Sequence, residues 1–146
     1  MSSCPQDFKT KTQHDPVFLY FENIFDREII SNLKNWLDDL NFKDGFSMEG
    51  KKIPRQQIWY QEKNKYFCEQ WKYRYDRWKS ENYNDFLKLI QDKIQEKING
   101  SLEKMPGIPK PKINSCLINK YRTGKDSIPP HRDCVESFGE YPTIAN

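Results

Sequence analysis

The chain has 146 residues and a formal net charge of +3, and 36% of its residues are hydrophobic while 14% are aromatic. This is the length of one domain with a core of its own, and the sequence has no apolar run long enough for a membrane-spanning helix. The weakly basic balance is compatible with a nucleic-acid partner but does not indicate one. The apolar content lies in a few large residues, so complete burial is difficult for the chain alone. We expect either a fragment or a subunit that lacks its sheet partner, or a domain with a long polar tail.

The cysteines and the N-terminal residues indicate the compartment. Cys4, Cys68, Cys116 and Cys134 form no Cys-x-x-Cys motif, and residues 1–16 are polar with no signal-peptide pattern. Reduced thiols are typical of intracellular proteins. We therefore expect a soluble protein of the cytoplasm or nucleus, with no membrane partner.

The first half of the chain predicts a tail, a strand and a helix. Residues 1–15 read as a polar tail, and the domain is expected to span residues 16–146. The short apolar run 17–21 (VFLYF) predicts a buried strand. Asp26 is a suitable N-cap for a helix over residues 27–40, where apolar residues follow helical spacing.

The middle of the chain predicts extended segments followed by a second helix. Residues 41–52 contain two glycines and indicate a loop or a hairpin, and the alternation over residues 54–60 predicts a strand. Asn84 is the predicted cap of a second helix that stops at Gly100. Its apolar stripe consists of Phe86, Leu87, Ile90, Ile94 and Ile98.

The last third predicts strands. After a proline-rich connector at 105–112, residues 115–122 read as a strand and residues 123–126 as a turn. Pro129 and Pro130 then favour an extended approach to His131. Two helices followed by strands indicate the α+β class with a mainly antiparallel sheet.

Two pairs of residues in this region have the spacing of a site. On an extended segment, His131 and Asp133 lie on the same face and match two of the three ligands of a non-haem iron facial triad. Asn119 and Tyr121 have the same spacing on the preceding strand. The alternatives are an exposed turn for the first pair and a half-buried amphipathic strand for the second.

The order of these residues resembles a known family. The stretch LINKYRTGKDSIPPHRD (117–133), followed by PTIA (142–145), is similar to the core motif of the AlkB family of Fe(II)- and 2-oxoglutarate-dependent dioxygenases, especially the nucleic-acid demethylases. Upstream, Pro54-Arg55-Gln56 with Trp59 and Tyr60 looks like the segment that precedes the family's nucleotide-recognition lid.

The resemblance implies a fold and an activity. The fold would be an incomplete double-stranded β-helix, or jelly roll, with two N-terminal supporting helices. His131 and Asp133 would bind Fe(II), and Asn119 and Tyr121 would hydrogen-bond 2-oxoglutarate. In the family, decarboxylation of 2-oxoglutarate to succinate accompanies oxidation of an N-methyl group on a damaged DNA or RNA base, which leaves as formaldehyde. This is a DNA-repair chemistry.

The residues implied for substrate binding are Arg55, Trp59, Tyr60, Cys134 and Glu136. The family's acidic base-reading residue stands two positions after the aspartate ligand. Val135 occupies that position here, and Glu136 follows one place later. We therefore expect recognition of a methylated base to depend on whether Glu136 can substitute.

The family's third iron ligand and its carboxylate-clamping arginine lie downstream of the residues that match 142–145. The only other histidine, His14, lies in the polar tail and is not expected to replace that ligand. We expect the chain alone to be inactive or nearly so, and a complementing C-terminal segment or chain to be a partner.

Residues 66–83 interleave aromatic and cationic side chains, a composition suited to single-stranded nucleic acid. The alternative is one buried helical face made of Phe67, Trp71, Tyr75 and Trp78. A second hypothesis follows, in which the chain is an inactive remnant that binds single-stranded nucleic acid. A third is a truncated domain that folds poorly.

Overall fold

The computed structural model describes residues 18–47, 49–62, 80–131 and 145, which belong to two compact units. The first, here called the sheet unit, takes in the described residues of Phe25–Asp85 and Asn114–His131. The second, here called the helical unit, takes in residues 18–24, Phe86–Ile113 and residue 145. Neither helix in the described part of the chain has the length and apolar character needed to cross a bilayer.

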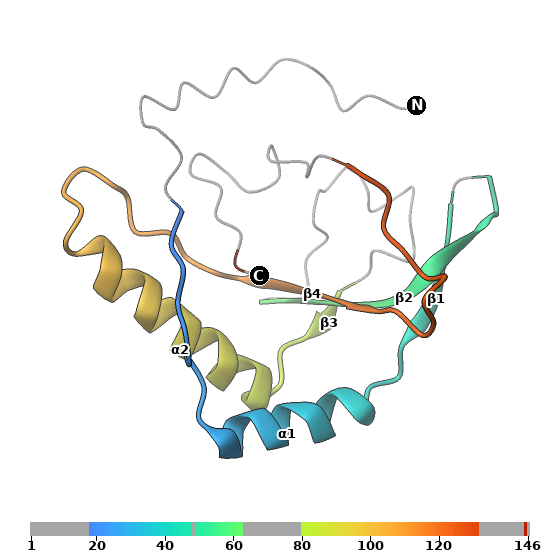
Figure 1. Cartoon of the computed structure of the whole chain (residues 1–146), viewed down its shortest axis with the longest axis horizontal. Helices are drawn as coiled ribbons and strands as arrows, with labels where there is room; N and C mark the ends of the chain where they lie inside the picture. Colours follow the sequence, from blue (N-terminus) through green and yellow to red (C-terminus); the bar gives the residue numbers. More distant parts are fainter. Residues whose placement is uncertain (1–17, 48, 63–79, 132–144, 146) are drawn as a thin grey trace. The chain divides into compact units, whose positions relative to one another are not determined.

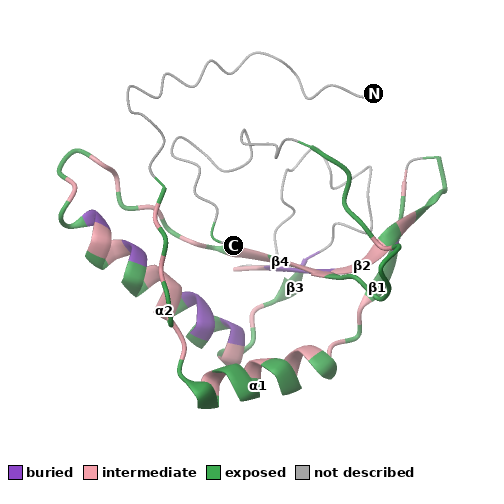
Figure 2. Cartoon of the chain, viewed as in Figure 1, coloured by how far each residue is buried: buried purple, intermediate pink, exposed green. Residues whose placement is uncertain are grey.

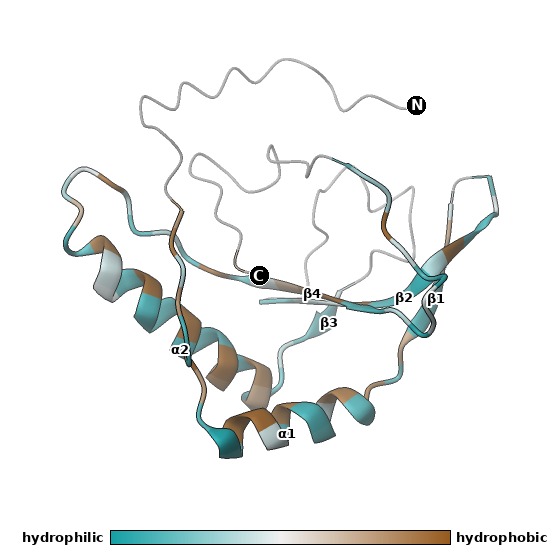
Figure 3. Cartoon of the chain, in the orientation of Figure 1, coloured by the Kyte–Doolittle hydropathy of each residue, from teal (hydrophilic) through white to brown (hydrophobic). Residues whose placement is uncertain are grey.

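Helix α1 (Arg27–Asp38) lies in the sheet unit and begins where its cap predicts (Figure 1). The carboxylate of Asp26 accepts a hydrogen bond from the backbone N–H of Ile29 at 2.8 Å, which satisfies one of the free donors of the first turn. The apolar positions of α1 gather along one side (Figure 3). On this side the Trp36 ring lies 6.0 Å from the ring of Tyr60, so α1 packs against the sheet.

The sheet is built around one long central strand, β2 (Lys52–Gln61). β1 (Lys43–Phe46) and β4 (Ser115–Lys120) both pair with it antiparallel, whereas the two-residue β3 (Glu81–Asn82) pairs parallel with its end. The predicted α+β class is confirmed, and the sheet is small and mixed. The hairpin alternative for residues 41–52 is also confirmed. The double-stranded β-helix stays a prediction.

The pairing of β2 with β4 gives the sheet two distinct faces. Gln57 lies opposite Asn119, and Ile58 lies opposite Ile118. Because side chains alternate along a strand, Ile58 and Tyr60 share the face that α1 covers. The other face, here called the site face, carries Arg55, Gln57 and Trp59 of β2 with Leu117 and Asn119 of β4.

Helix α2 (Asp85–Leu102) lies mostly in the helical unit. Its buried residues form one side of the helix (Figure 2) and are Leu87, Ile90, Gln91, Ile98 and Leu102. The predicted stop at Gly100 is wrong, since the helix continues for two more residues. The left-handed backbone that favours glycine occurs later, at Gly107 with φ of 87°.

The predicted strand at 17–21 is also wrong for the residues that the structure describes. Residues 18–21 lie outside any strand, and the side chains of Phe18 and Tyr20 are 89% and 75% exposed. A short apolar run becomes a strand only where another strand pairs with it, and no described strand does so. The predictions for residues 1–17, 63–79 and 132–144 fall outside the described residues, and they include Asp133, Cys134 and Glu136.

Candidate functional site

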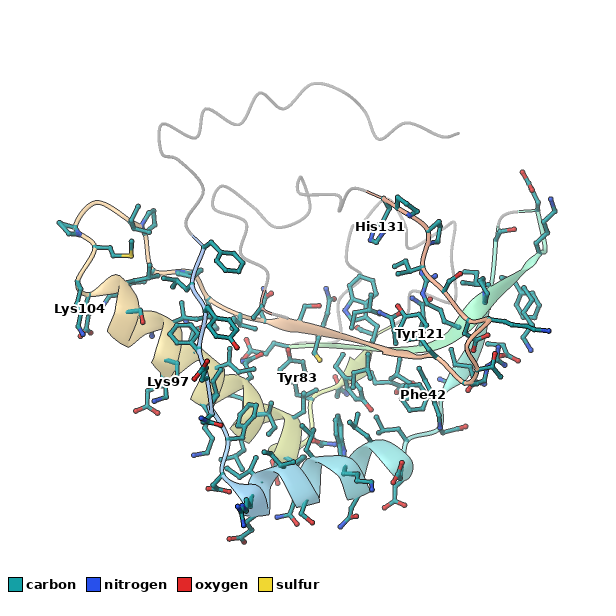
Figure 4. The ribbon with its side chains drawn as sticks, viewed as in Figure 1. Phe42, Tyr83, Lys97, Lys104, Tyr121 and His131 are labelled. Atoms are coloured by element: carbon teal, nitrogen blue, oxygen red, sulfur yellow. The ribbon has the colours of Figure 1, made fainter. Side chains whose placement is uncertain are left out.

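The site face brings Asn119 and Tyr121 to one side of β4. Asn119 is paired directly with Gln57, and Tyr121 follows the last residue of the strand with its side chain 47% exposed. Between them, Lys120 turns away and places its ammonium group 5.0 Å from the centre of the Phe42 ring. Figure 4 shows Tyr121 and His131 on the side of β4 opposite to Phe42. The predicted common face of Asn119 and Tyr121 therefore agrees with the strand geometry.

The side chain of Asn119 is held by two neighbours on β2. Its Oδ1 accepts a hydrogen bond from Arg55 Nε at 3.1 Å and another from Gln57 Nε2 at 2.9 Å. Both hydrogen bonds are partly buried, which strengthens them relative to the same pairs in water. Asn119 is therefore part of a fixed polar network.

The segment after β4 folds back onto β2. The predicted turn is confirmed by a hydrogen bond from the Asp126 N–H to the carbonyl of Thr123 at 3.0 Å. Ser127 then donates its N–H to the carbonyl of Pro54 at 2.8 Å, and Arg55 Nη1 donates to the carbonyl of Ser127 at 3.4 Å. These contacts fix the path of the chain towards His131.

Ion pairs of Arg122 stabilise the turn at residues 123–126. Arg122 Nε lies 2.9 Å from Asp126 Oδ2, and Arg122 Nη1 lies 3.3 Å from Asp44 Oδ1 on β1. The hydrogen bond from Arg122 lowers the pKa of the Asp126 carboxyl, and the hydrogen bond from Lys52 lowers that of Asp44. Because these groups are close to solvent, their attraction is screened and its role is mainly to set geometry.

His131 is exposed and has a defined ring orientation. Its Nδ1 lies 2.9 Å from the carbonyl oxygen of Pro129. A neutral imidazole that donates its Nδ1–H to this oxygen keeps its lone pair on Nε2, which is a common arrangement of metal-binding histidines. The donor chemistry therefore fits Fe(II). No group of three His, Cys, Asp or Glu residues within the described ranges could hold a metal ion, and Asp133 lies outside those ranges.

Of the five residues implied for substrate binding, the three that the structure describes occupy different places. Arg55 contacts Asn119 on the site face. Trp59 is on the same face but only 6% exposed, and its Nε1–H donates to Ser115 Oγ at 2.7 Å. Tyr60 lies on the opposite face with its ring beside that of Trp36. The sheet thus brings Arg55, but not Tyr60, to Asn119.

Sequence reasoning missed Gln57 and Ser127, both of which contact Arg55 or Asn119. Gln57 stands two residues after Arg55, so strand alternation places the two on one face. The sequence therefore contained a signal for Gln57. The contact of Ser127 with β2 depends on how the turn folds back, which local sequence does not determine.

A scan of models of known protein families finds none that matches this chain, and a search of curated proteins finds no match either.

Proposed function

We propose that this chain is an AlkB-like Fe(II)- and 2-oxoglutarate-dependent dioxygenase domain with a double-stranded β-helix core. Its substrates would be alkylated bases of DNA or RNA, which it would demethylate by oxidation. The proposal is carried by one observation: Asn119, Tyr121 and His131 come to one side of β4, in the order of the family's motif.

The residue chemistry supports this proposal. The amide of Asn119 and the hydroxyl of Tyr121 can donate hydrogen bonds to the carboxylate oxygens of 2-oxoglutarate. The Nε2 atom of His131, with the carboxylate of Asp133, would hold Fe(II). When bound, iron supplies the oxidation of the N-methyl group by O2, coupled to decarboxylation of 2-oxoglutarate.

The test is a succinate assay with Fe(II), 2-oxoglutarate and methylated single-stranded DNA or RNA. It is run on the chain alone and with the complementing segment that the resemblance implies. We expect succinate in at least one mixture and its loss in His131→Ala and in Asp133→Ala. The matched control is Lys125→Ala in the neighbouring turn, which removes an exposed side chain and should keep the activity.

Absence of succinate in every mixture, together with no binding of 2-oxoglutarate, would overturn the proposal. The same preparations then test the rival hypothesis. Salt-dependent binding of an oligonucleotide that survives His131→Ala, and is lost in the double variant Trp71→Ala with Arg74→Ala, would indicate a nucleic-acid-binding module.

A further inference from the structure

The orientation of the Asn119 amide is determined by Arg55. A guanidinium group has five N–H donors and no acceptor, so the atom that it meets must accept. Arg55 Nε lies 3.1 Å from Asn119, and that atom of Asn119 is the carbonyl oxygen Oδ1. With the amide flipped, two donors would face each other and the hydrogen bond would be lost.

Gln57 completes this arrangement. It lies directly across from Asn119 in the strand register and donates its Nε2–H to the same Oδ1 at 2.9 Å. A carbonyl oxygen has two lone pairs, so these two donors satisfy it. Within the part of the chain that the structure describes, the Nδ2 group of Asn119 makes no hydrogen bond. Asn119 thus offers its two N–H donors to a ligand.

Arg55 has a second contact on the path to His131. Its Nη1 donates to the carbonyl of Ser127 at 3.4 Å, and the preceding residue, Pro54, accepts the Ser127 N–H at 2.8 Å. One side chain of β2 is therefore bonded both to the amide on β4 and to the segment that leads to His131. Gln57, in contrast, is bonded to the amide and not to this segment.

We propose that Arg55 and Gln57 are positioning residues that direct the Asn119 NH2 group at a carboxylate ligand, and that Arg55 also couples this amide to the segment of His131. The inference rests on the proposed function for the identity of the ligand, 2-oxoglutarate. A carboxylate only accepts hydrogen bonds, so a flipped amide would present oxygen to oxygen and repel it. Arg55 accordingly acts through Asn119 and not as a contact to the nucleic acid.

The first experiment removes the NH2 group of Asn119, which donates to the ligand, and keeps the oxygen that accepts from Arg55 and Gln57. In Asn119→Asp, the carboxylate still accepts from Arg55 and Gln57, and the charge-assisted hydrogen bond from Arg55 becomes an ion pair. We expect an unchanged or higher urea midpoint, but at least a tenfold loss of affinity for 2-oxoglutarate in anaerobic calorimetry with Fe(II). The control Asn35→Asp makes the same chemical change at an exposed position of α1, and the affinity for 2-oxoglutarate should stay at the wild-type value.

The second experiment separates the two positioning residues by NMR without any ligand. Arg55→Lys keeps the charge but loses the planar guanidinium group that contacts both Asn119 and Ser127. It should therefore shift both the Asn119 side-chain amide signals and the His131 ring signals. Gln57→Ala should shift the amide signals alone. Arg27→Lys, an exposed change of the same kind at the start of α1, should shift neither.

The outcomes distinguish this inference from the proposed function. Affinity for 2-oxoglutarate that survives Asn119→Asp, or amide signals that ignore Arg55→Lys, would overturn the inference and leave the proposed function standing. A wild-type protein that shows the expected variant shifts, but has no affinity for 2-oxoglutarate either alone or with the complementing segment, would overturn the proposed function.

Discussion

Trp59 lies on the site face, but its burial and its hydrogen bond indicate a role in stability. Its ring is buried, its Nε1–H donates to Ser115 Oγ at 2.7 Å, and the Ser115 hydroxyl in turn donates to the carbonyl of Tyr60 at 3.3 Å. We expect Trp59→Phe to lower the free energy of unfolding by about 1–3 kcal/mol, because it removes both ring volume and a buried donor. Urea unfolding measures this change.

The control for this prediction is Tyr121→Phe, which removes a hydroxyl from an exposed side chain on the same side of the sheet. A change within about 0.5 kcal/mol is expected there. Equal effects of the two substitutions would contradict the structural role of Trp59.

At single residues, the sequence predicted the faces better than the contacts. Alternation correctly grouped Asn119 with Tyr121. The same rule separates Trp59 from Tyr60, because neighbouring residues on a strand point to opposite faces, yet both were expected at one substrate surface. The contact between Gln57 and Asn119 could not be predicted, since it depends on pairing residues 62 positions apart.

At the scale of elements, Gln95 joins α2 to the connector that follows it. Its Nε2 donates to the carbonyl of Pro111 at 2.8 Å, and its Oε1 accepts the N–H of Ile113 at 2.8 Å. We expect Gln95→Ala to cost about 1–2 kcal/mol, since both hydrogen bonds are partly buried. Hydrogen exchange of the Ile113 amide should become faster.

The matched control is Glu96→Ala, the next residue along α2, whose side chain is exposed. It should leave the exchange of Ile113 unchanged. If Gln95→Ala did not accelerate this exchange either, the connector would be held by other contacts.

The elements themselves were predictable wherever a periodic pattern and a cap coincide. α1 begins as predicted after Asp26 and ends two residues before the expected position. At Gly100 the expectation failed because glycine in a helix costs only about 1 kcal/mol, which neighbouring buried residues such as Ile98 and Leu102 can offset. β3 was missed because two residues carry no periodic signal.

At the scale of the whole described sheet unit, three ionisable groups, one buried and two half-buried, have pKa values shifted in the same direction. Burial raises the pKa of the Cys116 thiol to about 11, and burial is also the largest cause that raises the pKa values of Tyr60 and Tyr83. All three groups are neutral at pH 7. Cys116 lies on β4, Tyr60 on β2 and Tyr83 directly after β3, so ionisation at alkaline pH would disfavour the folded state at three places in the sheet.

Because the pKa of the Cys116 thiol is higher in the folded chain than in the unfolded chain, the free energy of unfolding depends on pH. Below pH 9, the ordinary thiol pKa, Cys116 is protonated in the folded and the unfolded chain alike. Between pH 9 and about 11 the unfolded chain ionises first, so the free energy of unfolding falls with rising pH, by roughly 2–3 kcal/mol at most from this thiol. Urea titrations at successive pH values measure the slope. In Cys116→Ala the slope over this window should become shallower, whatever the variant's stability at pH 7, and a wild-type stability that is flat from pH 9 to 11 would contradict the burial of the thiol.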